Sequence, residues 1–334
     1  MRFDPLLVLK EYPFRVKDIV QIKDGVFMVD TDAGPMCLKQ SDRNEGKVLF
    51  IYSVLKHLVD SGFTKVSLPV LTEKGSPLVK LEGEIYSITK WIHGVNCDFH
   101  RQSHLAAATQ TLGEFHLVSK GLNVLPGGKA RAMYYRWPEV FQERTEDLKL
   151  FKYRVQEKVW RTDFEKKYLQ YADEIIAQAE RAYDGLSKSQ YLRLAEEAEK
   201  QGTFTHRDVA DRNFIIARDG QAYMIDFDYC RYDLRLTDLV RLVERTLKDD
   251  SWEPEKADFI INRYNKVAPL EPNEYLVMQV FFQFPQKAWR VCNRYFNKKK
   301  RWQEEGYIKK LKQAVKNTDS KEKFIDCFTE QYCR

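Results

Sequence analysis

The sequence has no long apolar run. No window approaches the roughly 18 to 20 continuous apolar residues that a membrane-spanning helix needs, so we expect no membrane span. The first residues, MRFDPLLVLKEYPF, include a short apolar run, but Asp4 and Pro5 interrupt it and no small-residue cleavage site follows. We therefore expect no secretion signal and a protein that is made and retained in a cytoplasm.

Cysteine is sparse in this chain. Its six cysteines are scattered over 334 residues, and no two of them have Cys-x-x-Cys spacing. Thiolate metal sites and redox pairs use that spacing, and disulfide frameworks belong to short secreted chains. The sequence therefore argues against both a thiolate metal site and a disulfide-stapled fold.

The glycine-rich phosphate-binding loops are also missing. Gly-x-x-x-x-Gly-Lys-Ser/Thr does not occur, PGGKA at 126–130 lacks the spacing, and there is no Gly-x-Gly-x-x-Gly. Any bound nucleotide would have to be covered by the turn Lys23-Asp24-Gly25, which has a single glycine. This sparse cradle predicts weaker or differently shaped nucleotide binding than a phosphate loop provides.

Positive charge is in modest excess, with a net charge of +6. The dense basic run is NKKKRW at 297–302, and two glutamates follow it closely, so a solvated helix face is the simpler interpretation. No zinc-finger, recognition-helix or RNA-binding aromatic signature accompanies the run. We therefore expect no nucleic-acid partner.

The chain divides by pattern into a sheet-rich first part and a helical second part. Residues 18–40 contain three β-rich runs, residues 45–62 have helical spacing closed by a glycine, and residues 78–92 return to strands. This predicts an α+β protein with a small, mostly antiparallel N-terminal sheet lobe, 1–92, and a larger, mainly helical C-terminal lobe, 93–334. Within the second lobe we expect helix breaks at Gly185, Pro254, Pro269, Pro272 and Pro285.

The stretch FTHRDVADRNFIIARDGQAYMIDFDY, residues 204–229, places polar groups between short apolar runs. FII and AYMI predict two strands joined by an RDG turn, a hairpin that brings Asn213 and Asp226 to the same end. A carboxamide and a carboxylate supply hard oxygen ligands that suit magnesium. Asp208, on the loop before the hairpin, would face an acceptor hydroxyl, as phosphoryl transfer requires.

Lys39 ends the third predicted strand, where its ammonium group could reach donor phosphates across a cleft between the lobes. A helix acid would be expected to orient it, but Glu45 lies very early in the following helix. Each signal alone is weak, because His-x-Asp is common by chance and a strand-end lysine is usually solvated. Their conjunction favours a phosphotransferase-like fold, although a fold does not fix an activity.

The motifs HRDVADRN and MIDFD resemble the His-Gly-Asp-x-x-x-x-Asn and Ile-Asp-Trp/Phe motifs of the aminoglycoside and choline phosphotransferase branch of the protein-kinase-like superfamily. DLRLTDLVRL resembles the Asp-Leu-Ala segment of that branch, which would make Asp238 a structural carboxylate. Over nearly the whole chain the sequence is similar to the bacterial spore coat CotS-like family. The stretches that carry this similarity are VLFIYSVLKHLVDSGF, YSITKWIHG, RTEDLKLFK, MIDFDYCRYDLRLTDL and PLEPNEYLVMQVFFQFPQKAWRVCNRYF.

The resemblance implies a bilobal protein-kinase-like fold that uses ATP and Mg²⁺. Asp208 would be the catalytic base, Asn213 and Asp226 the magnesium ligands, and Lys39 the group that holds the donor phosphates. His206 would be a structural element of the catalytic loop. The resemblance also implies a place in the coat of an endospore, assembled from the mother-cell cytoplasm.

The resemblance places the adenine contact at the segment TKWIHG. There the backbone groups of Lys90, Trp91 and Ile92 would meet the base. Asp228 would be a second metal or acceptor contact, and a surface turn residue is an equally good interpretation.

Two functions follow as expectations. The first is an ATP- and magnesium-dependent phosphotransferase that acts on a hydroxyl of a small molecule or glycan. The alternative is a catalytically weak or inactive component of the spore coat, whose basic run at Lys298–Arg301 and tyrosines would contact other coat proteins. The sequence identifies neither the acceptor nor the oligomeric state. For each aromatic among the possible acceptor-pocket residues, core packing is the simpler interpretation. These residues are Trp137, Tyr153, Arg154, Trp289 and Arg294.

Overall fold

The computed structural model describes residues 4–247, 251–297 and 303–333. The chain forms two compact units. The first comprises Met1–Ala132, Gln201–Asp238 and Asn262–Ala268, and the second comprises Met133–Lys200, Leu239–Ile261 and Pro269–Arg334. The lobe boundary expected after residue 92 falls within the first unit and stays a prediction, and the basic run at 298–301 lies outside the described residues.

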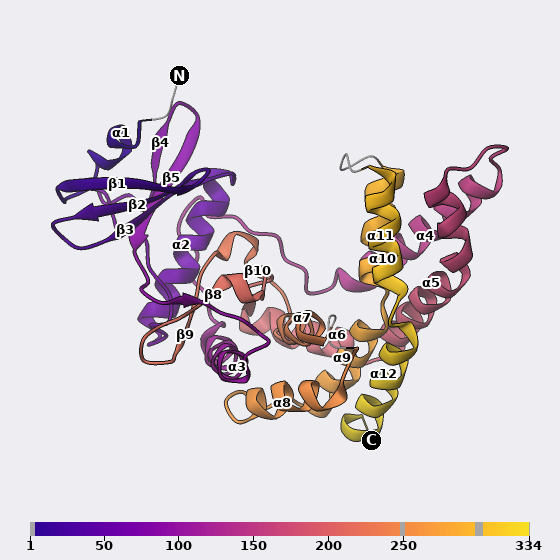
Figure 1. Ribbon diagram of the computed structural model, residues 1–334. Coiled ribbons are helices and arrows are strands. Elements are labelled where there is room, and N and C mark those ends of the chain that lie inside the picture. The colour runs from indigo at the N-terminus through magenta and orange to yellow at the C-terminus, as the bar shows by residue number, and fades with distance from the viewer. Residues whose placement is uncertain (1–3, 248–250, 298–302, 334) are drawn as a thin grey trace. The chain divides into compact units, whose positions relative to one another are not determined.

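The first unit is built on a five-stranded antiparallel sheet (Figure 1). Its strands, in spatial order, are β1 (Val16–Lys23), β2 (Val26–Thr31), β3 (Met36–Ser41), β5 (Glu84–Lys90) and β4 (Val79–Leu81). Leu38 and Ile88 lie opposite each other on β3 and β5 and are fully buried in the core, where α1 (Leu6–Leu9) also packs. The predicted N-terminal antiparallel sheet is confirmed.

Helix α2 (Glu45–Asp60) follows β3 and confirms the predicted helix. Asn44 caps it by accepting a hydrogen bond from the backbone N–H of Lys47 at 3.0 Å. Gly62, with φ +85°, lies just beyond its end in the left-handed conformation that glycine adopts readily. One face of this helix is buried, as the apolar spacing predicts, and it includes Phe50 and Leu58.

The polar stretch 204–229 folds into short strands and two 3₁₀ turns. Phe214 pairs with Met224, which confirms the predicted hairpin. A Cβ at Gly94 would lie 2.3 Å from the Ile216 carbonyl oxygen, so only glycine allows this close approach. The elements of this stretch are β7 (Phe204–Thr205), η1 (Asp211–Asn213), β8 (Phe214–Ile216), β9 (Ala222–Met224) and η2 (Phe227–Tyr229). The first unit also contains β6 (Val95–Asn96), α3 (Gln102–Val118) and β10 (Arg231–Tyr232).

The second unit is helical. Helix α5 (Asp163–Lys188) runs through Gly185, so the predicted break there is wrong. A Cβ at Gly185 would lie 3.1 Å from Val280 Cγ2, so the glycine serves close packing against α9 (Pro272–Gln283) rather than helix termination. The prolines do divide the remaining helices, because α8 (Pro254–Asn265) and α9 each begin at one.

The other helices of the C-terminal part complete this picture. Helix α7 (Leu236–Leu247) begins in the chain segment of the first unit and continues into that of the second. None of the described helices is both long and apolar enough to span a membrane. The remaining elements are α4 (Trp137–Gln156), α6 (Tyr191–Gln201), α10 (Gln286–Phe296), α11 (Glu304–Val315) and α12 (Thr318–Tyr332).

Candidate active site

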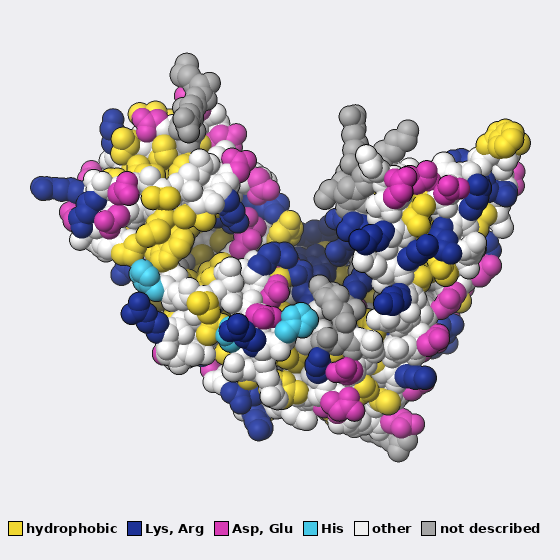
Figure 2. Space-filling view, in the orientation of Figure 1, with side chains coloured by type: hydrophobic (Ala, Val, Ile, Leu, Met, Phe, Trp, Pro, Cys, Tyr) yellow, Lys and Arg dark blue, Asp and Glu magenta, His cyan; other side chains and the backbone are white. Residues whose placement is uncertain are grey.

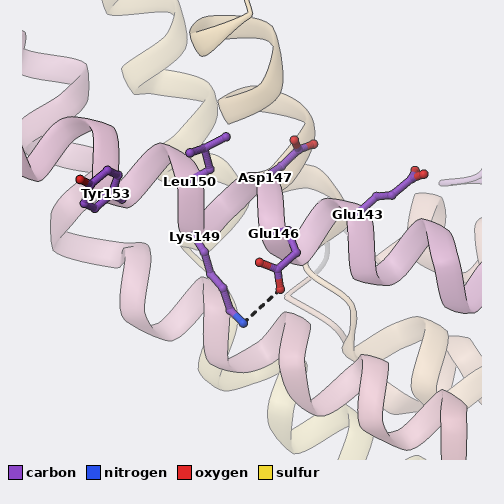
Figure 3. Close-up of a pocket in the computed structure, with 6 residues that line it drawn as sticks. All are labelled: Glu143, Glu146, Asp147, Lys149, Leu150 and Tyr153. Carbon is purple, nitrogen blue, oxygen red and sulfur yellow. Dashed lines mark hydrogen bonds and ion pairs between the residues drawn. The ribbon is translucent and has the colours of Figure 1, made fainter.

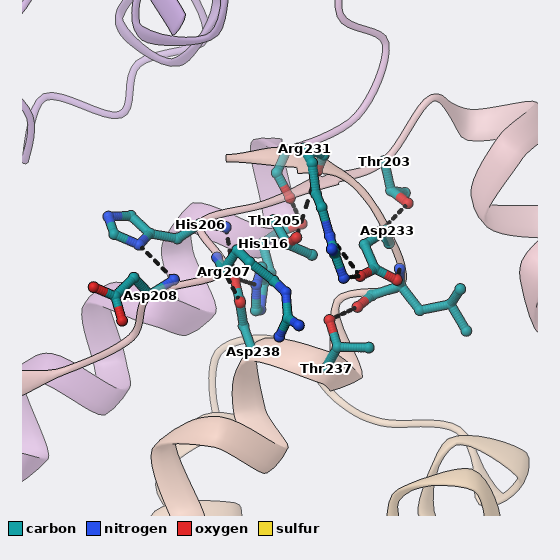
Figure 4. A network of polar contacts seen from close by, with 12 residues as sticks. His116, Thr203, Thr205, His206, Arg207, Asp208, Arg231, Asp233, Thr237 and Asp238 are labelled. Atoms are coloured by element: carbon teal, nitrogen blue, oxygen red, sulfur yellow. Dashed lines mark hydrogen bonds and ion pairs between the residues drawn. The ribbon is translucent and has the colours of Figure 1, made fainter. Parts of the chain in front are cut away.

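A buried carboxylate holds the backbone of the loop that follows β7. Asp238, at the start of α7, accepts hydrogen bonds from the backbone N–H groups of His206 at 2.7 Å and Arg207 at 2.8 Å (Figure 4). Arg207 has φ +72°, an uncommon conformation for a residue with a side chain. His116 Nε2 lies 3.4 Å from the same carboxylate, and its Nδ1 lies 2.7 Å from the Tyr264 hydroxyl. Asp238 is thus a structural carboxylate of this loop.

The ring of His206 ties the loop to the hairpin. Its Nε2–H donates to the Ile225 carbonyl at 3.0 Å, and its Nδ1 accepts from the backbone N–H of Asp208 at 3.3 Å. Burial lowers the pKa of His206, although the Asp238 carboxylate acts in the opposite direction. A neutral imidazole fits this pattern of one donor and one acceptor.

Asp208 is joined to Asn213 by two hydrogen bonds. The Asn213 Nδ2 group donates to the Asp208 carbonyl at 2.7 Å and to its Oδ2 at 2.9 Å. Arg212 also donates to Asp208 Oδ2, at 2.7 Å. The carboxylate is therefore held in a fixed orientation, and the carboxamide oxygen of Asn213 makes no hydrogen bond within the described residues.

Lys39 is paired with two carboxylates. Its Nζ lies 2.8 Å from Asp226 Oδ1 and 2.9 Å from Asp228 Oδ2. Burial alone would lower the pKa of Lys39, but the carboxylates of Asp228 and Asp226 outweigh it and raise the pKa. For Asp226, burial opposes ionisation, and the Lys39 ammonium group overcomes it and lowers the pKa. Asp226 also has φ +64°, the kind of backbone strain that collects at functional sites.

These two groups of side chains meet at one end of the hairpin. The backbone N–H of Ile225 donates to the Asn213 carbonyl at 3.0 Å, directly beside Asp226. The sequence-predicted residues Lys39, Asp208, Asn213 and Asp226 are thus brought into one region of the first unit. No group of three or more His, Cys, Asp or Glu side chains in the described part of the chain is arranged to hold a metal ion by itself.

The oxygen donors here fit magnesium rather than a softer metal. Asn213 offers a carboxamide oxygen, and Asp226 and Asp228 each offer a second carboxylate oxygen besides the one that faces Lys39. Magnesium takes few protein ligands and completes its shell with water and substrate phosphates. A donor set of one amide and two carboxylates suits that preference.

Glu45 does not orient Lys39. It is paired instead with Lys80 at 2.6 Å, and both side chains are exposed. Lys47, two positions further along α2, donates to the Cys230 carbonyl next to η2, and burial lowers its pKa. The sequence does not predict this contact or the Arg212–Asp208 pair, because nothing in the spacing marks which cation turns toward a loop.

The segment expected to contact adenine lies along an open hollow of about 590 Å³. Two of its backbone groups are already engaged, because Ser67 Oγ donates to the Lys90 carbonyl at 2.8 Å and the Trp91 N–H donates to the Pro35 carbonyl at 3.0 Å. The Ile92 N–H has no backbone partner among the residues that the structure describes. Ser67–Val70, Lys90–His93, Ala217 and Tyr223 are among the lining residues.

The aromatic residues considered for an acceptor pocket differ in burial. Trp137 is buried, as core packing predicts, whereas Tyr153 is exposed. Tyr153 lines an open hollow of about 660 Å³ on α4, where Lys149 Nζ lies 3.3 Å from Glu146 Oε1 (Figure 3). The same Lys149 Nζ lies 3.0 Å from Glu180 Oε1 on α5. This hollow has the character of a solvated helix face.

The fold is that of kinase-like phosphotransferases. An aminoglycoside phosphotransferase from Alicyclobacillus acidocaldarius superposes with a TM-score of 0.86, with 20% sequence identity, and the match covers 99% of this chain and 97% of that one. Spectinomycin phosphotransferase APH(9)-Ia, solved with ADP and spectinomycin, has a TM-score of 0.62 with 13% identity, and covers 96% and 99%. The predicted α+β, protein-kinase-like fold is confirmed.

Sequence comparison goes further than the fold. The family model described as "Spore coat putative kinase YutH" matches residues 7–328, so the chain belongs to this spore coat family. It is also 25% identical to spore coat protein S of Bacillus subtilis (strain 168), over 97% of this chain and 93% of that protein. The family resemblance stated from the motifs is confirmed.

Proposed function

We propose that this protein is an ATP- and magnesium-dependent phosphotransferase that acts on a hydroxyl group of a small molecule or glycan. The observation that carries the proposal is the convergence of the Lys39–Asp226 ion pair with the Asp208–Asn213 pair at one end of the hairpin. Phosphoryl transfer depends mainly on positioning and charge neutralisation, and these groups supply both.

Each residue has a distinct role in this proposal. Lys39 holds the donor phosphates, Asn213 and Asp226 hold the magnesium ion through oxygen atoms, and Asp228 adds a further carboxylate. Bound magnesium would neutralise charge on the phosphates. The adenine base would lie along Lys90–Ile92, where the Ile92 N–H has no backbone partner among the described residues.

Asp208 is the proposed catalytic base. It accepts the proton of the acceptor hydroxyl while that oxygen forms a bond to the terminal phosphorus of ATP and the bond to the leaving ADP oxygen breaks. Arg212 and Asn213 both donate to Asp208 Oδ2. The two donors therefore hold the carboxylate of the proposed base in one orientation.

Membership of the spore coat family supports a place in the coat, assembled from the mother-cell cytoplasm. The proposed partners are a small-molecule or glycan acceptor and other coat proteins. The similarity to a phosphotransferase solved with spectinomycin supports an acceptor of that size.

Replacement of Asp208 tests the proposal. Transfer of labelled phosphate from Mg-ATP to a panel of amino alcohols, sugars and glycans is measured for the native chain and for Asp208→Asn, whose carboxamide keeps the shape but cannot accept the proton. We expect a loss of about 10²–10⁴-fold with unchanged thermal stability. Asp211→Asn, on the exposed side of the same loop, is the matched control and should retain activity. Equal transfer by Asp208→Asn and the native chain would rule out the proposed base.

The alternative of an inactive coat component has one observation in its favour. Lys39 is paired with one carboxylate oxygen of Asp226 and one of Asp228. Glu45, the helix acid expected to orient Lys39, is paired with Lys80 instead. A thermal titration with Mg-ATP separates the two functions, because a ligand that binds the native state raises the melting temperature once its concentration exceeds Kd. No shift at millimolar Mg-ATP would favour the scaffold function.

A further inference from the structure

Arg43, on the loop between β3 and α2, lies against the η2 turn of the candidate active site. Its guanidinium carbon is 4.7 Å from the centroid of the Tyr229 ring, and Tyr229 directly follows Asp228 in the chain. Burial alone would lower the pKa of this arginine, but Tyr229 and the charges of Asp42 and Asp228 outweigh burial and raise the pKa. Arg43 is therefore a second cation beside the carboxylate that Lys39 holds.

Exposed charge alone does not single out Arg43. On the face of the first unit that Figure 2 shows, Lys and Arg side chains are interspersed with Asp and Glu. The Arg43 side chain is only 26% exposed, and its Nε is buried without a hydrogen-bond partner among the residues that the structure describes. The Nε lies 3.2 Å from Asp42 Oδ1, but that carboxylate is exposed, and exposed ion pairs contribute little. Arg43 therefore has donors to offer to another acceptor.

The Asp228 carboxylate depends on a cation. Its side chain is 19% exposed, and a carboxylate with so little contact with water is costly without a partner. Lys39 is that partner in the structure, and it also holds Asp226, so two of its three donors are used. In the proposed reaction Lys39 holds the donor phosphates, whose larger negative charge competes for the same ammonium group. Asp228 then needs another cation.

Lys47 also lies beside this turn, but its ammonium group is engaged elsewhere. It donates to the Cys230 carbonyl and lies over the Phe50 ring, 4.8 Å from the centroid. These contacts hold the chain just after η2. Of the two cations, Arg43 is therefore the better placed to meet the Asp228 carboxylate.

We propose that Arg43 is a positioning residue that takes over the Asp228 carboxylate when Lys39 turns to the donor phosphates. This inference rests on the phosphotransferase function proposed above. A guanidinium group suits the exchange, because its N–H groups can meet a carboxylate while its face stays on the Tyr229 ring. Asp228 then keeps a charged partner, and the η2 turn stays in place next to Asp226.

Thermal unfolding without nucleotide tests the exchange within the chain. In the native chain Lys39 holds Asp228, so Arg43→Gln should lower the melting temperature by less than about 1 °C. In Lys39→Met, where Arg43 has taken over, the same change should lower it by about 2 °C or more. Arg218→Gln, at the exposed turn between β8 and β9, removes the same charge and should have one small effect in both chains.

Binding of Mg-ATP, followed by thermal shift, tests the consequence for the nucleotide. Arg43→Gln should raise the apparent Kd about tenfold, because Asp228 then retains Lys39. Arg43→Lys keeps the charge and should restore most of the affinity. In Asp228→Asn, which has no charge to neutralise, Arg43→Gln should change the Kd little. Arg218→Gln should bind Mg-ATP like the native chain.

Two outcomes would overturn the proposal. One is an equal loss of melting temperature from Arg43→Gln in the native chain and in Lys39→Met, because the arginine would then act in packing alone. The other is the same Kd for Mg-ATP in Arg43→Gln and in the native chain. A native chain that does not respond to Mg-ATP would instead contradict the proposed function. The unfolding comparison uses no nucleotide, so it still decides whether Arg43 replaces Lys39 at Asp228.

Discussion

Lys39 Nζ lies 2.8 Å from Asp226 Oδ1, although the two residues are 187 positions apart in the sequence. The contact joins the end of β3 to the residue that follows β9. Each partner shifts the other toward its charged form, since the pKa of Lys39 is raised and that of Asp226 is lowered. This ion pair links the N-terminal sheet to the hairpin of β8 and β9.

Replacement of Lys39 by methionine should weaken nucleotide binding far more than it weakens the fold. Both partners of the ion pair are more than one-third exposed, so the pair contributes little to stability. We expect the apparent Kd for Mg-ATP, followed by thermal shift, to rise roughly tenfold or more. Lys80→Met, which breaks the exposed pair with Glu45, is the matched control and should leave Kd unchanged.

Asp238→Ala should destabilise the first unit. The carboxylate is fully buried and accepts two backbone hydrogen bonds, from His206 and Arg207, which would be left without an acceptor. Charge-assisted hydrogen bonds of this kind are worth about 1.5–3 kcal/mol each, so the loss of both should lower the free energy of unfolding, measured in urea, by about 3–6 kcal/mol. A loss below about 0.5 kcal/mol, the range of surface substitutions, would contradict the structural role.

Stability should fall as the solution becomes acidic, in part because of His206. Burial holds the pKa of this residue below its usual 6.5, so the unfolded chain binds a proton that the folded chain does not. Above the unfolded pKa both states are neutral at this residue, so it does not reduce the free energy of unfolding. As the pH falls below the unfolded pKa, the free energy of unfolding decreases by at most about 1.4 kcal/mol per pH unit for one histidine. Urea unfolding of the native chain and of His206→Gln between about pH 5 and pH 7 measures this. If both proteins lose stability in parallel, other groups cause the effect.

Gly94→Ala should cost more stability than Gly185→Ala. The added Cβ would lie 2.3 Å from the backbone oxygen of Ile216 in the first case and 3.1 Å from a side-chain methyl of Val280 in the second. Backbone cannot yield as a side chain can, and alanine at the helical position regains about 1 kcal/mol of helix propensity. We expect a difference of at least about 2 kcal/mol by urea unfolding. Equal costs would show that β6 shifts to admit the methyl group.

The pattern of the sequence was sufficient for the elements that depend on local periodicity. The alternation in β3 and β5, the helical spacing of α2 and the hairpin of β8 and β9 are each set by which side chains must be buried. The hairpin then brings Asn213 and Asp226 to one end, because antiparallel pairing leaves no other arrangement.

The contacts that were missed depend on tertiary structure instead. Gly185 predicts a helix break because glycine disfavours helices, but in the structure its lack of a side chain allows close packing against Val280. The partners of Lys47 and Arg212 also had no signature, since long cationic side chains can reach many acceptors. Two of the missed side chains therefore lie at the candidate site itself.

The two bonds from Asn213 Nδ2 to Asp208 limit what can replace this asparagine. Aspartate has nearly the same shape and would offer a better metal ligand, but it has no N–H group, and it would place a second negative charge against the Asp208 carboxylate. Glutamine has the required atoms at the wrong reach. Position 213 should therefore tolerate few exchanges, even conservative ones.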